Sequence, residues 1–240
     1  MTDDLIVLYE DNHLIVVLKP QNMPCCEDVT GDKDLLTLVK EHVKEKENKQ
    51  GNVYVGLVHR LDRVTGGVMV YAKSSKAAAR LSEQIRNGDF EKKYLTVVVG
   101  EPKENRAFLT DYMKKNPVNN MVYVCPPTVE GAKRAELEYL TVDKKDGLSL
   151  LSVTLHTGRT HQIRVQMAHN GTPVYGDMRY GGENAVKGRI ALWSTSLAIF
   201  HPISKERMVF KIQPPKDVKP WNLFNIDDDV LIYDCQNRKL

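Results

Sequence analysis

The chain has 240 residues, of which 42% are hydrophobic and 27% are charged, as in an ordinary folded domain. The formal net charge of +3 excludes a strongly polycationic protein. No run approaches the roughly 20 consecutive apolar residues of a membrane-spanning helix, and no apolar signal segment opens the chain. The sequence therefore indicates neither a membrane protein nor a secreted one.

Basic residues and cysteines narrow the class further. Neighbouring basic pairs indicate a polyanionic partner, although such pairs more often form solvated surface. The cysteines show no C-x-x-C spacing, so neither a zinc knuckle nor a redox pair is predicted. Free thiols suit a reducing compartment, and we therefore expect a cytoplasmic protein. The basic pairs are Lys92-Lys93, Lys114-Lys115, Lys133-Arg134 and Lys144-Lys145, and the cysteines are Cys25, Cys26, Cys125 and Cys235.

The first elements in chain order are a β-hairpin and a helix. Residues 6–20, IVLYEDNHLIVVLKP, contain two apolar runs separated by Glu-Asp-Asn-His, which is a hairpin pattern. The second run ends at Lys19-Pro20. Residues 34–50 begin with apolar residues at helical spacing and continue into a charged stretch, which predicts a helix with a solvated end.

A loop and a second helix follow. The runs at 54–58 and 68–73 are strand-like, so HRLDRVTGG at 59–67 is predicted to be a loop between two strands. SSKAAARLSEQIRNG at 74–88 is predicted to be a helix. Its N-cap is Ser74 or Ser75, and Asn87-Gly88 ends it.

The remainder of the chain is rich in strands. A strand is predicted at 92–100, and the turn-rich segments 115–120 and 143–147 each predict a hairpin with their flanking runs. Late strands are predicted at 190–200 and 207–213. Many strands joined by hairpins, with few helices, predict an α+β fold with a largely antiparallel mixed sheet and a few flanking helices. No linker rich in Pro, Gly or Ser divides the chain, so we expect one domain over residues 1–240.

The loop HRLDRVTGG places one carboxylate, Asp62, between two guanidinium groups, Arg60 and Arg63. Neighbouring cations favour the ionised form of an acid, so Asp62 suits a nucleophile or an electrostatic stabiliser better than a proton donor. Gly66 and Gly67 permit a positive φ or a close approach of another backbone. The loop is therefore a candidate site for an anionic catalytic group.

A second segment, GRTHQIRVQMAHN at 158–170, is predicted to be a helix that Thr160 caps and Asn170-Gly171 ends. A helical wheel places Arg164 within the apolar stripe. A guanidinium cannot lose its proton, so a buried one needs an anionic partner, and we expect Arg164 to pair with Asp62. Considered alone, such a pair is more often structural than catalytic.

These segments resemble the motifs of RluA-type pseudouridine synthases. HRLDRVTGG resembles their HRLDxxTSG motif, GRTHQIRVQM resembles GRTHQIRVHM, EKKYLTVVVG matches their K-x-Y segment, and residues 6–20 resemble their opening strand pair. The order and spacing also fit, and the resemblance covers roughly residues 5–215. It implies the catalytic fold of that family. Because it starts near residue 5, we expect no small RNA-binding domain before it, and expect substrate choice to come from the catalytic domain's own surface, including residues 100–130.

The resemblance implies an enzyme that isomerises uridine in ribosomal or transfer RNA to pseudouridine, as a monomer and with neither metal nor organic cofactor. It assigns Asp62 as the catalytic aspartate, Arg164 as its salt-bridge partner, and Tyr94 as the residue that stacks on the base and assists C5 deprotonation. Arg60 corresponds to the arginine that acts when the uridine is flipped out of the RNA. The resemblance also marks Arg60, Thr65, Arg159 and His161 as substrate-binding candidates. Taken alone, His59 and His161 are more typical of hydrogen-bonding scaffold.

Three departures from the family pattern concern specificity more than chemistry. Gly66 replaces the usual serine, Gln166 replaces the usual histidine, and PQNMPCCED at 20–28 replaces the usual Pro-x-Gly opening. Two other classes of function remain open. An RNA-binding protein without turnover would leave RNA unchanged, whereas an N-glycosidic hydrolase would release free uracil.

Overall fold

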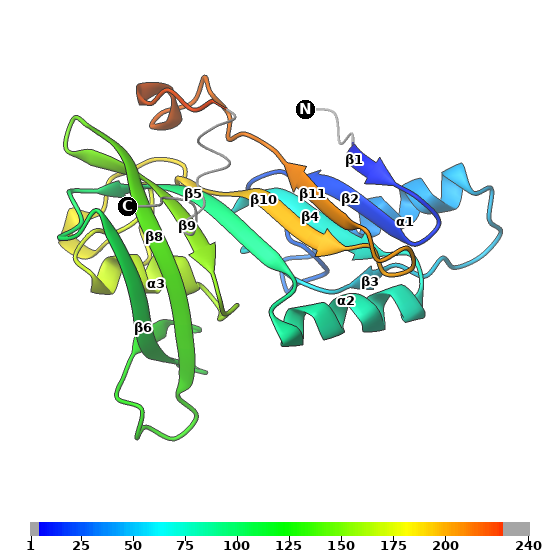
Figure 1. Ribbon diagram of the computed structural model, residues 1–240, viewed down its shortest axis with the longest axis horizontal. Helices are drawn as coiled ribbons and strands as arrows, with labels where there is room; N and C mark the ends of the chain where they lie inside the picture. Colours follow the sequence, from blue (N-terminus) through cyan, green and yellow to red (C-terminus); the bar gives the residue numbers. More distant parts are fainter. Residues whose placement is uncertain (1–4, 228–240) are drawn as a thin grey trace. The chain divides into compact units, whose positions relative to one another are not determined.

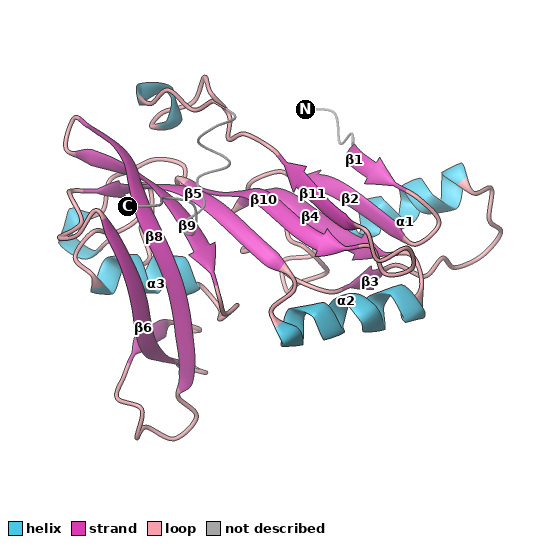
Figure 2. Cartoon of the chain, viewed as in Figure 1, coloured by secondary structure: helices cyan, strands magenta, loops and turns pink. Residues whose placement is uncertain are grey.

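A computed structural model describes residues 5–227, which form two compact units (Figure 1). Unit 1 contains residues 5–91 and 194–212, and unit 2 contains residues 92–193 and 213–227. Antiparallel strand pairs dominate both units and helices are few (Figure 2), so the predicted α+β class with a largely antiparallel mixed sheet is confirmed. The expectation of a single domain over residues 1–240 stays a prediction.

The sheet of unit 1 surrounds a strand that is buried along its whole length, β4. The strand order within the unit is β1-β2-β4-β10, and β11 pairs with β10 and β3 with β4. The predicted hairpin of β1 and β2 is confirmed, as are the two strands that flank the loop 59–67. The strands are β1 (Ile6–Glu10), β2 (Leu14–Lys19), β3 (Gly56–Leu57), β4 (Gly66–Ala72), β10 (Leu192–Phe200) and β11 (Arg207–Lys211).

Two helices flank the sheet of unit 1, α1 (Leu35–Lys46) and α2 (Ser75–Asn87). Asp34 caps α1 by accepting from the Thr37 amide, and Ser74 caps α2 as predicted, by accepting from the Ala77 amide. Gly88 ends α2 with φ of 84°, a conformation that glycine adopts without strain.

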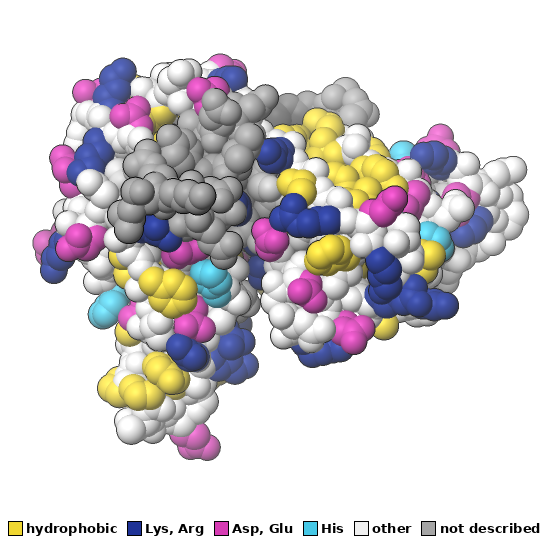
Figure 3. Space-filling view, viewed as in Figure 1, with side chains coloured by type: hydrophobic (Ala, Val, Ile, Leu, Met, Phe, Trp, Pro, Cys, Tyr) yellow, Lys and Arg dark blue, Asp and Glu magenta, His cyan; other side chains and the backbone are white. Residues whose placement is uncertain are grey.

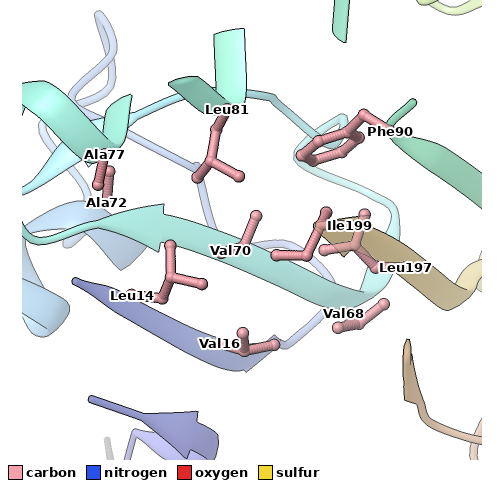
Figure 4. Close-up of a cluster of buried hydrophobic side chains, with 10 residues drawn as sticks. All are labelled: Leu14, Val16, Val68, Val70, Ala72, Ala77, Leu81, Phe90, Leu197 and Ile199. Atoms are coloured by element: carbon pink, nitrogen blue, oxygen red, sulfur yellow. The ribbon is translucent and has the colours of Figure 1, made fainter. Parts of the chain in front are cut away.

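Apolar alternation along the strands explains how α2 packs on the sheet. Alternate residues of a strand share a face, and one face of β2 and β4 carries small aliphatic side chains that meet α2. Figure 4 shows Leu81 of α2 and Phe90 pointing toward this layer. The buried cluster consists of Leu14, Val16, Val68, Val70, Ala72, Ala77, Leu81, Phe90, Leu197 and Ile199.

The sheet of unit 2 has the order β5-β9-β8-β6-β7, with every neighbouring pair antiparallel. Both predicted hairpins are confirmed, but β8 is longer than expected. The turn between β8 and β9 uses only Asp146 and Gly147, with φ of 53° and 71°, so the preceding polar residues continue the strand. The strands are β5 (Glu91–Val99), β6 (Arg106–Lys115), β7 (Val122–Val124), β8 (Lys133–Lys145) and β9 (Leu148–Leu155).

The single α-helix among the described residues of unit 2 is α3 (Gln162–His169). Val165 of this helix packs with Met113, Val122 and Ala135, and Ile163 and Met167 are also buried. The prediction that Thr160 caps α3 is wrong, because His161 is the residue before the helix, with φ of 55° and no side-chain capping bond. Asn170 and Gly171 end the helix as predicted.

Three of the four cysteines lie within the described residues. Cys25, Cys26 and Cys125 carry free thiols, whereas Cys235 lies outside the described residues. Within residues 5–227, no helix is both long enough and apolar enough to cross a membrane.

Candidate active site

The loop that carries Asp62 connects β3 to β4 in unit 1. Asp62 is half-buried, and its carbonyl accepts from the Thr65 amide at 2.9 Å, which closes a tight turn. The charge of this carboxylate is close enough to Lys19 to act on the pKa of that residue. The turn thus holds an acid beside a buried cation.

Lys19, the last residue of β2, fastens the backbone of this loop. Its ammonium is fully buried and donates to the carbonyls of Pro20 (2.9 Å), Arg63 (3.0 Å) and Thr65 (2.8 Å). Burial lowers the pKa of Lys19 to about 8, although Cys25 and Asp62 act in the opposite direction. The Gln21 side chain adds a bond to the Val64 carbonyl at 3.1 Å, so three consecutive loop carbonyls have donors.

Cys25 supports the other end of the turn. Its buried thiol donates to the Leu61 carbonyl at 3.0 Å and accepts from the Leu61 amide at 3.3 Å. Burial raises the pKa of this thiol, with the ammonium of Lys19 opposing the rise. Cys25 belongs to the segment that departs from the family pattern, and it contacts the backbone immediately before Asp62.

The two arginines beside Asp62 have different surroundings. Arg63 donates to Thr30 at 2.9 Å and forms ion pairs with Asp32 and, at 3.5 Å, with Asp28. Arg60 is exposed and has no hydrogen bond or ion pair within residues 5–227. Arg60 is therefore the flanking arginine whose charge is not already compensated by the loop at 28–32.

Thr65 and Gly67, near the end of the motif, are both buried. Gly67 has φ of 126°, and a Cβ there would lie 2.2 Å from the Ser194 carbonyl oxygen on β10. The predicted need for a positive φ and a close backbone approach is therefore confirmed at Gly67. Thr65 is buried, and its hydroxyl has no partner among the described residues. Its role in substrate binding stays a prediction.

His59 fills a structural position beneath β4. Its Nε2 accepts from the Val70 amide at 3.1 Å, and its ring lies edge-on to Phe90 with centroids 5.1 Å apart. A ring nitrogen that accepts from a backbone amide carries no proton, so these contacts fit the scaffold interpretation.

Unit 2 contains the other candidate residues. Tyr94 is buried in β5 opposite Val153 of β9. Arg164 is buried in α3, as the helical wheel predicts, and only 6% of its surface is exposed. Its Nε and Nη2 donate to the two carboxylate oxygens of Asp177 at 2.7 and 2.8 Å. This two-pronged geometry suits a guanidinium facing a carboxylate.

Asp177 is the buried partner of Arg164 that sequence reasoning missed. It is buried, and its Oδ1 also accepts from the amides of Arg179 and Tyr180. The available signal was the buried arginine itself, which required a carboxylate, but no local pattern near residue 177 indicated which one. Because Asp62 belongs to unit 1 and Arg164 to unit 2, the expected pairing of those two residues stays a prediction.

Tyr180 links the start of α3 to the arginine. Its ring lies under the Arg164 guanidinium, 5.1 Å from the centroid to Cζ. Its hydroxyl accepts from the Val122 amide at 3.1 Å and lies 2.7 Å from Nδ1 of His161. The hydroxyl oxygen has two acceptor sites and one proton, so the His161 contact can run in either direction according to the tautomer of the ring. These contacts support the scaffold interpretation of His161.

Arg159 precedes α3, and Gln166 lies within this helix. The Nε of Arg159 donates to the Arg134 carbonyl at 2.8 Å, and the rest of its side chain is exposed. Gln166 is fully buried, and its amide nitrogen donates to Asp111 at 2.7 Å. Within residues 5–227, no group of three or more His, Cys, Asp or Glu side chains is placed to hold a metal ion. The expectation that no cofactor is needed stays a prediction.

Comparisons with known proteins agree with the motifs. The family model described as RNA pseudouridylate synthase matches residues 13–169. A Bacillus subtilis (strain 168) protein named uncharacterized RNA pseudouridine synthase YjbO is 32% identical over 217 residues, covering 89% of this chain and 74% of its own. Ribosomal large subunit pseudouridine synthase D of Zymomonas mobilis subsp. mobilis is 31% identical over 227 residues, covering 90% of this chain and 71% of its own.

A solved structure supports the fold. Human RNA Pseudouridylate Synthase Domain Containing 4 matches with a TM-score of 0.74 at 20% identity, covering 88% of this chain and 89% of that one. The chain therefore belongs to the RNA pseudouridylate synthase family, and it is an isomerase that converts uridine in RNA to pseudouridine.

Proposed function

We propose that Asp62 is the catalytic nucleophile of this enzyme. The observation that carries the proposal is the fixed loop around it, in which Lys19, Gln21 and Cys25 bind the backbone on both sides of Asp62. An acid that must reach one atom of a substrate benefits from a backbone that is held in place before binding. The resemblance of HRLDRVTGG to the family motif points to the same residue.

The reaction assigns distinct work to the other residues. The N1–C1′ bond of uridine breaks, the base turns, and C5 bonds to C1′ while C5 loses a proton and N1 gains one. Tyr94 stacks on the base and assists removal of the C5 proton, and Arg164 pairs with Asp62 and orients its carboxylate. Arg60, whose charge has no partner within residues 5–227, enters the RNA stack when the uridine is flipped out.

We further propose that the substrate is ribosomal RNA. Relatives from Zymomonas mobilis and Vibrio vulnificus carry the names ribosomal large subunit pseudouridine synthase D and C, which favours ribosomal over transfer RNA. We expect the enzyme to act in the cytoplasm as a monomer. Pseudouridine mapping of total RNA from cells with and without the protein identifies the modified position, and a site in transfer RNA would overturn the ribosomal assignment.

The test of the nucleophile is Asp62→Asn, which keeps the shape of the side chain and removes its charge. Tritium release from RNA labelled at uridine C5 should fall to the background level while the unfolding curve stays cooperative. The control is Asp89→Asn, which removes an exposed carboxylate from the same unit and should react as the wild type does. Turnover in a folded Asp62→Asn protein would refute the role.

Product analysis separates the alternative functions. Isomerisation leaves the mass of the RNA unchanged and converts uridine to pseudouridine. Free uracil would indicate hydrolysis of the N-glycosidic bond, and bound but unchanged RNA would indicate a binding protein without turnover.

A further inference from the structure

Lys92 has no role in the reaction described above, yet it lies next to Tyr94 on the sheet. Both residues belong to β5, and residues two apart in a strand project from the same face. Their Cα atoms are therefore about 7 Å apart along the strand, at roughly 3.4 Å per residue. A group bound at Lys92 would lie within one nucleotide of a base stacked on Tyr94.

The ammonium of Lys92 is half-buried without an anionic partner. Within residues 5–227 it forms no hydrogen bond and no ion pair, and loss of water contact alone lowers its pKa. The other buried lysines are satisfied: Lys19 by three carbonyls, and Lys73 by Glu10 at 2.8 Å and Glu47 at 2.7 Å. Withdrawing a charge from water without a partner is costly, so this site calls for an anion.

Gly158 leaves the ammonium of Lys92 accessible to a ligand. A Cβ at position 158 would lie 3.5 Å from Lys92 Nζ and would meet no other atom within 4 Å beyond its chain neighbours. Gly158 is not among the glycines with positive φ, so the backbone conformation does not require glycine there. The absence of a side chain instead leaves access to the ammonium.

Further donors lie beside the opening. The amide of Gly158 donates to no acceptor among the described residues. The next residue, Arg159, is exposed and uses only Nε internally, on the Arg134 carbonyl. The nearby Glu136 carboxylate pairs with Arg134 at 2.7 Å. An ammonium, a backbone amide and a guanidinium together match the oxygens of a phosphate group.

We propose that Lys92, the Gly158 amide and Arg159 form a subsite that binds a backbone phosphate of the RNA, adjacent to the nucleotide being isomerised. The proposal rests on the proposed function for the identity of its ligand. The net charge of the protein is only +3, and the face drawn in Figure 3 shows Lys and Arg interspersed with Asp and Glu instead of one basic patch. The subsite would therefore add a specific phosphate contact that the overall charge does not supply.

The test measures binding of oligouridylate by wild type, Lys92→Met, Gly158→Ala and the control Lys103→Met across a range of salt concentrations. Lys92→Met should bind ~10-fold more weakly and lower the salt slope of the affinity by about 0.7, the value for one phosphate contact on a single strand. Gly158→Ala keeps the charge and covers it, so binding should weaken ~3-fold or more while the fold persists. Lys103 is an exposed loop lysine, and its replacement should change neither quantity.

Stability separates this role from a structural one. Met replaces the unpaired charge by an apolar group, so Lys92→Met should unfold at the same urea concentration as wild type or a higher one. A destabilised Lys92→Met protein, or one with wild-type affinity and salt slope, overturns the proposal. A lower kcat with unchanged affinity also overturns it, because Lys92 would then act on Tyr94 instead of a phosphate.

The outcome for wild type keeps the two proposals distinct. If wild type releases no tritium from RNA labelled at uridine C5, the proposed function fails whatever the variants do. If wild type releases tritium and Lys92→Met binds oligouridylate with wild-type affinity, only the proposal of a phosphate subsite is refuted.

Discussion

Unit 1 and unit 2 each bury a cation on which the proposed reaction depends, but the two cations have different hydrogen-bond acceptors. In unit 1, Lys19 donates to three backbone carbonyls around the Asp62 turn. In unit 2, Arg164 donates through two nitrogens to the carboxylate of Asp177. Lys19 thus fixes a stretch of backbone, whereas Asp177 fixes the direction of a single side chain.

The chemistry of the two cations explains the difference. An ammonium presents three donors around one atom and can collect acceptors that arrive from several directions. A guanidinium is a flat fork that matches the two oxygens of a carboxylate. Replacing Asp177 should therefore leave a buried guanidinium without this carboxylate, whereas replacing Lys19 leaves only carbonyls without a donor.

The largest expected effect follows from Asp177→Asn. This change removes the buried carboxylate that receives two guanidinium bonds, and it should lower the free energy of unfolding by about 3 kcal/mol or more. Urea denaturation measures the loss. The double variant with Arg164→Met should regain part of it, because the buried charge is then gone. Strictly additive losses would mean that the two side chains do not depend on each other.

The pH dependence of the Lys19 contribution should be the next largest. The folded pKa is about 8 and the unfolded value is 10.5, so between these values the unfolded chain holds more protons and stability rises with pH. Relative to Lys19→Met, wild type should gain up to about 3 kcal/mol of unfolding free energy between pH 8 and 10.5. Urea denaturation of both proteins at several pH values tests this, and a constant difference would contradict the lowered pKa.

At pH 7, Lys19→Met should have a smaller effect than Asp177→Asn. Three carbonyls lose their donor, but the folded protein no longer has to bury a charge, so we expect a net loss of about 2 kcal/mol in unfolding free energy. Turnover should fall by more than the fraction of unfolded protein accounts for, because the backbone around Asp62 is no longer held by the ammonium. Equal losses for Lys19→Met and Asp177→Asn would remove the distinction between the two cations.

The sequence predicted the parts of this arrangement that depend on local signals. Apolar runs and turn residues placed the hairpins, Ser74 and Gly88 bounded α2, and the helical wheel placed Arg164 inside. Asp177 escaped prediction because only the tertiary fold brings it to Arg164. The sequence predicts Thr160 as the N-cap of α3, but the cap is His161. His161 adopts a left-handed backbone conformation, which the identity of the residue does not predict. For Lys19 the sequence predicts only the end of a strand, because no local pattern reveals the carbonyls of Arg63 and Thr65 as partners.

The smallest expected effect concerns Cys25, whose thiol bonds both to the amide and to the carbonyl of Leu61. Valine is close to cysteine in shape but cannot form either bond, so Cys25→Val should cost about 1 kcal/mol of unfolding free energy. Serine keeps a donor and an acceptor at this position, so Cys25→Ser should retain more of the turnover than Cys25→Val.

These variants test whether the loop of unit 1 is held through its backbone, because Leu61 directly precedes Asp62. If the unit 1 loop is held through its backbone, Cys25→Val should lower kcat for tritium release more than it raises KM, since the substrate still binds while the carboxylate is less well placed. Cys26→Val, at the neighbouring and less buried cysteine, is the matched control and should behave as wild type does. If Cys25→Val matched wild type in both kcat and stability, the backbone of the turn would be held by Lys19 and Gln21 without help from the thiol.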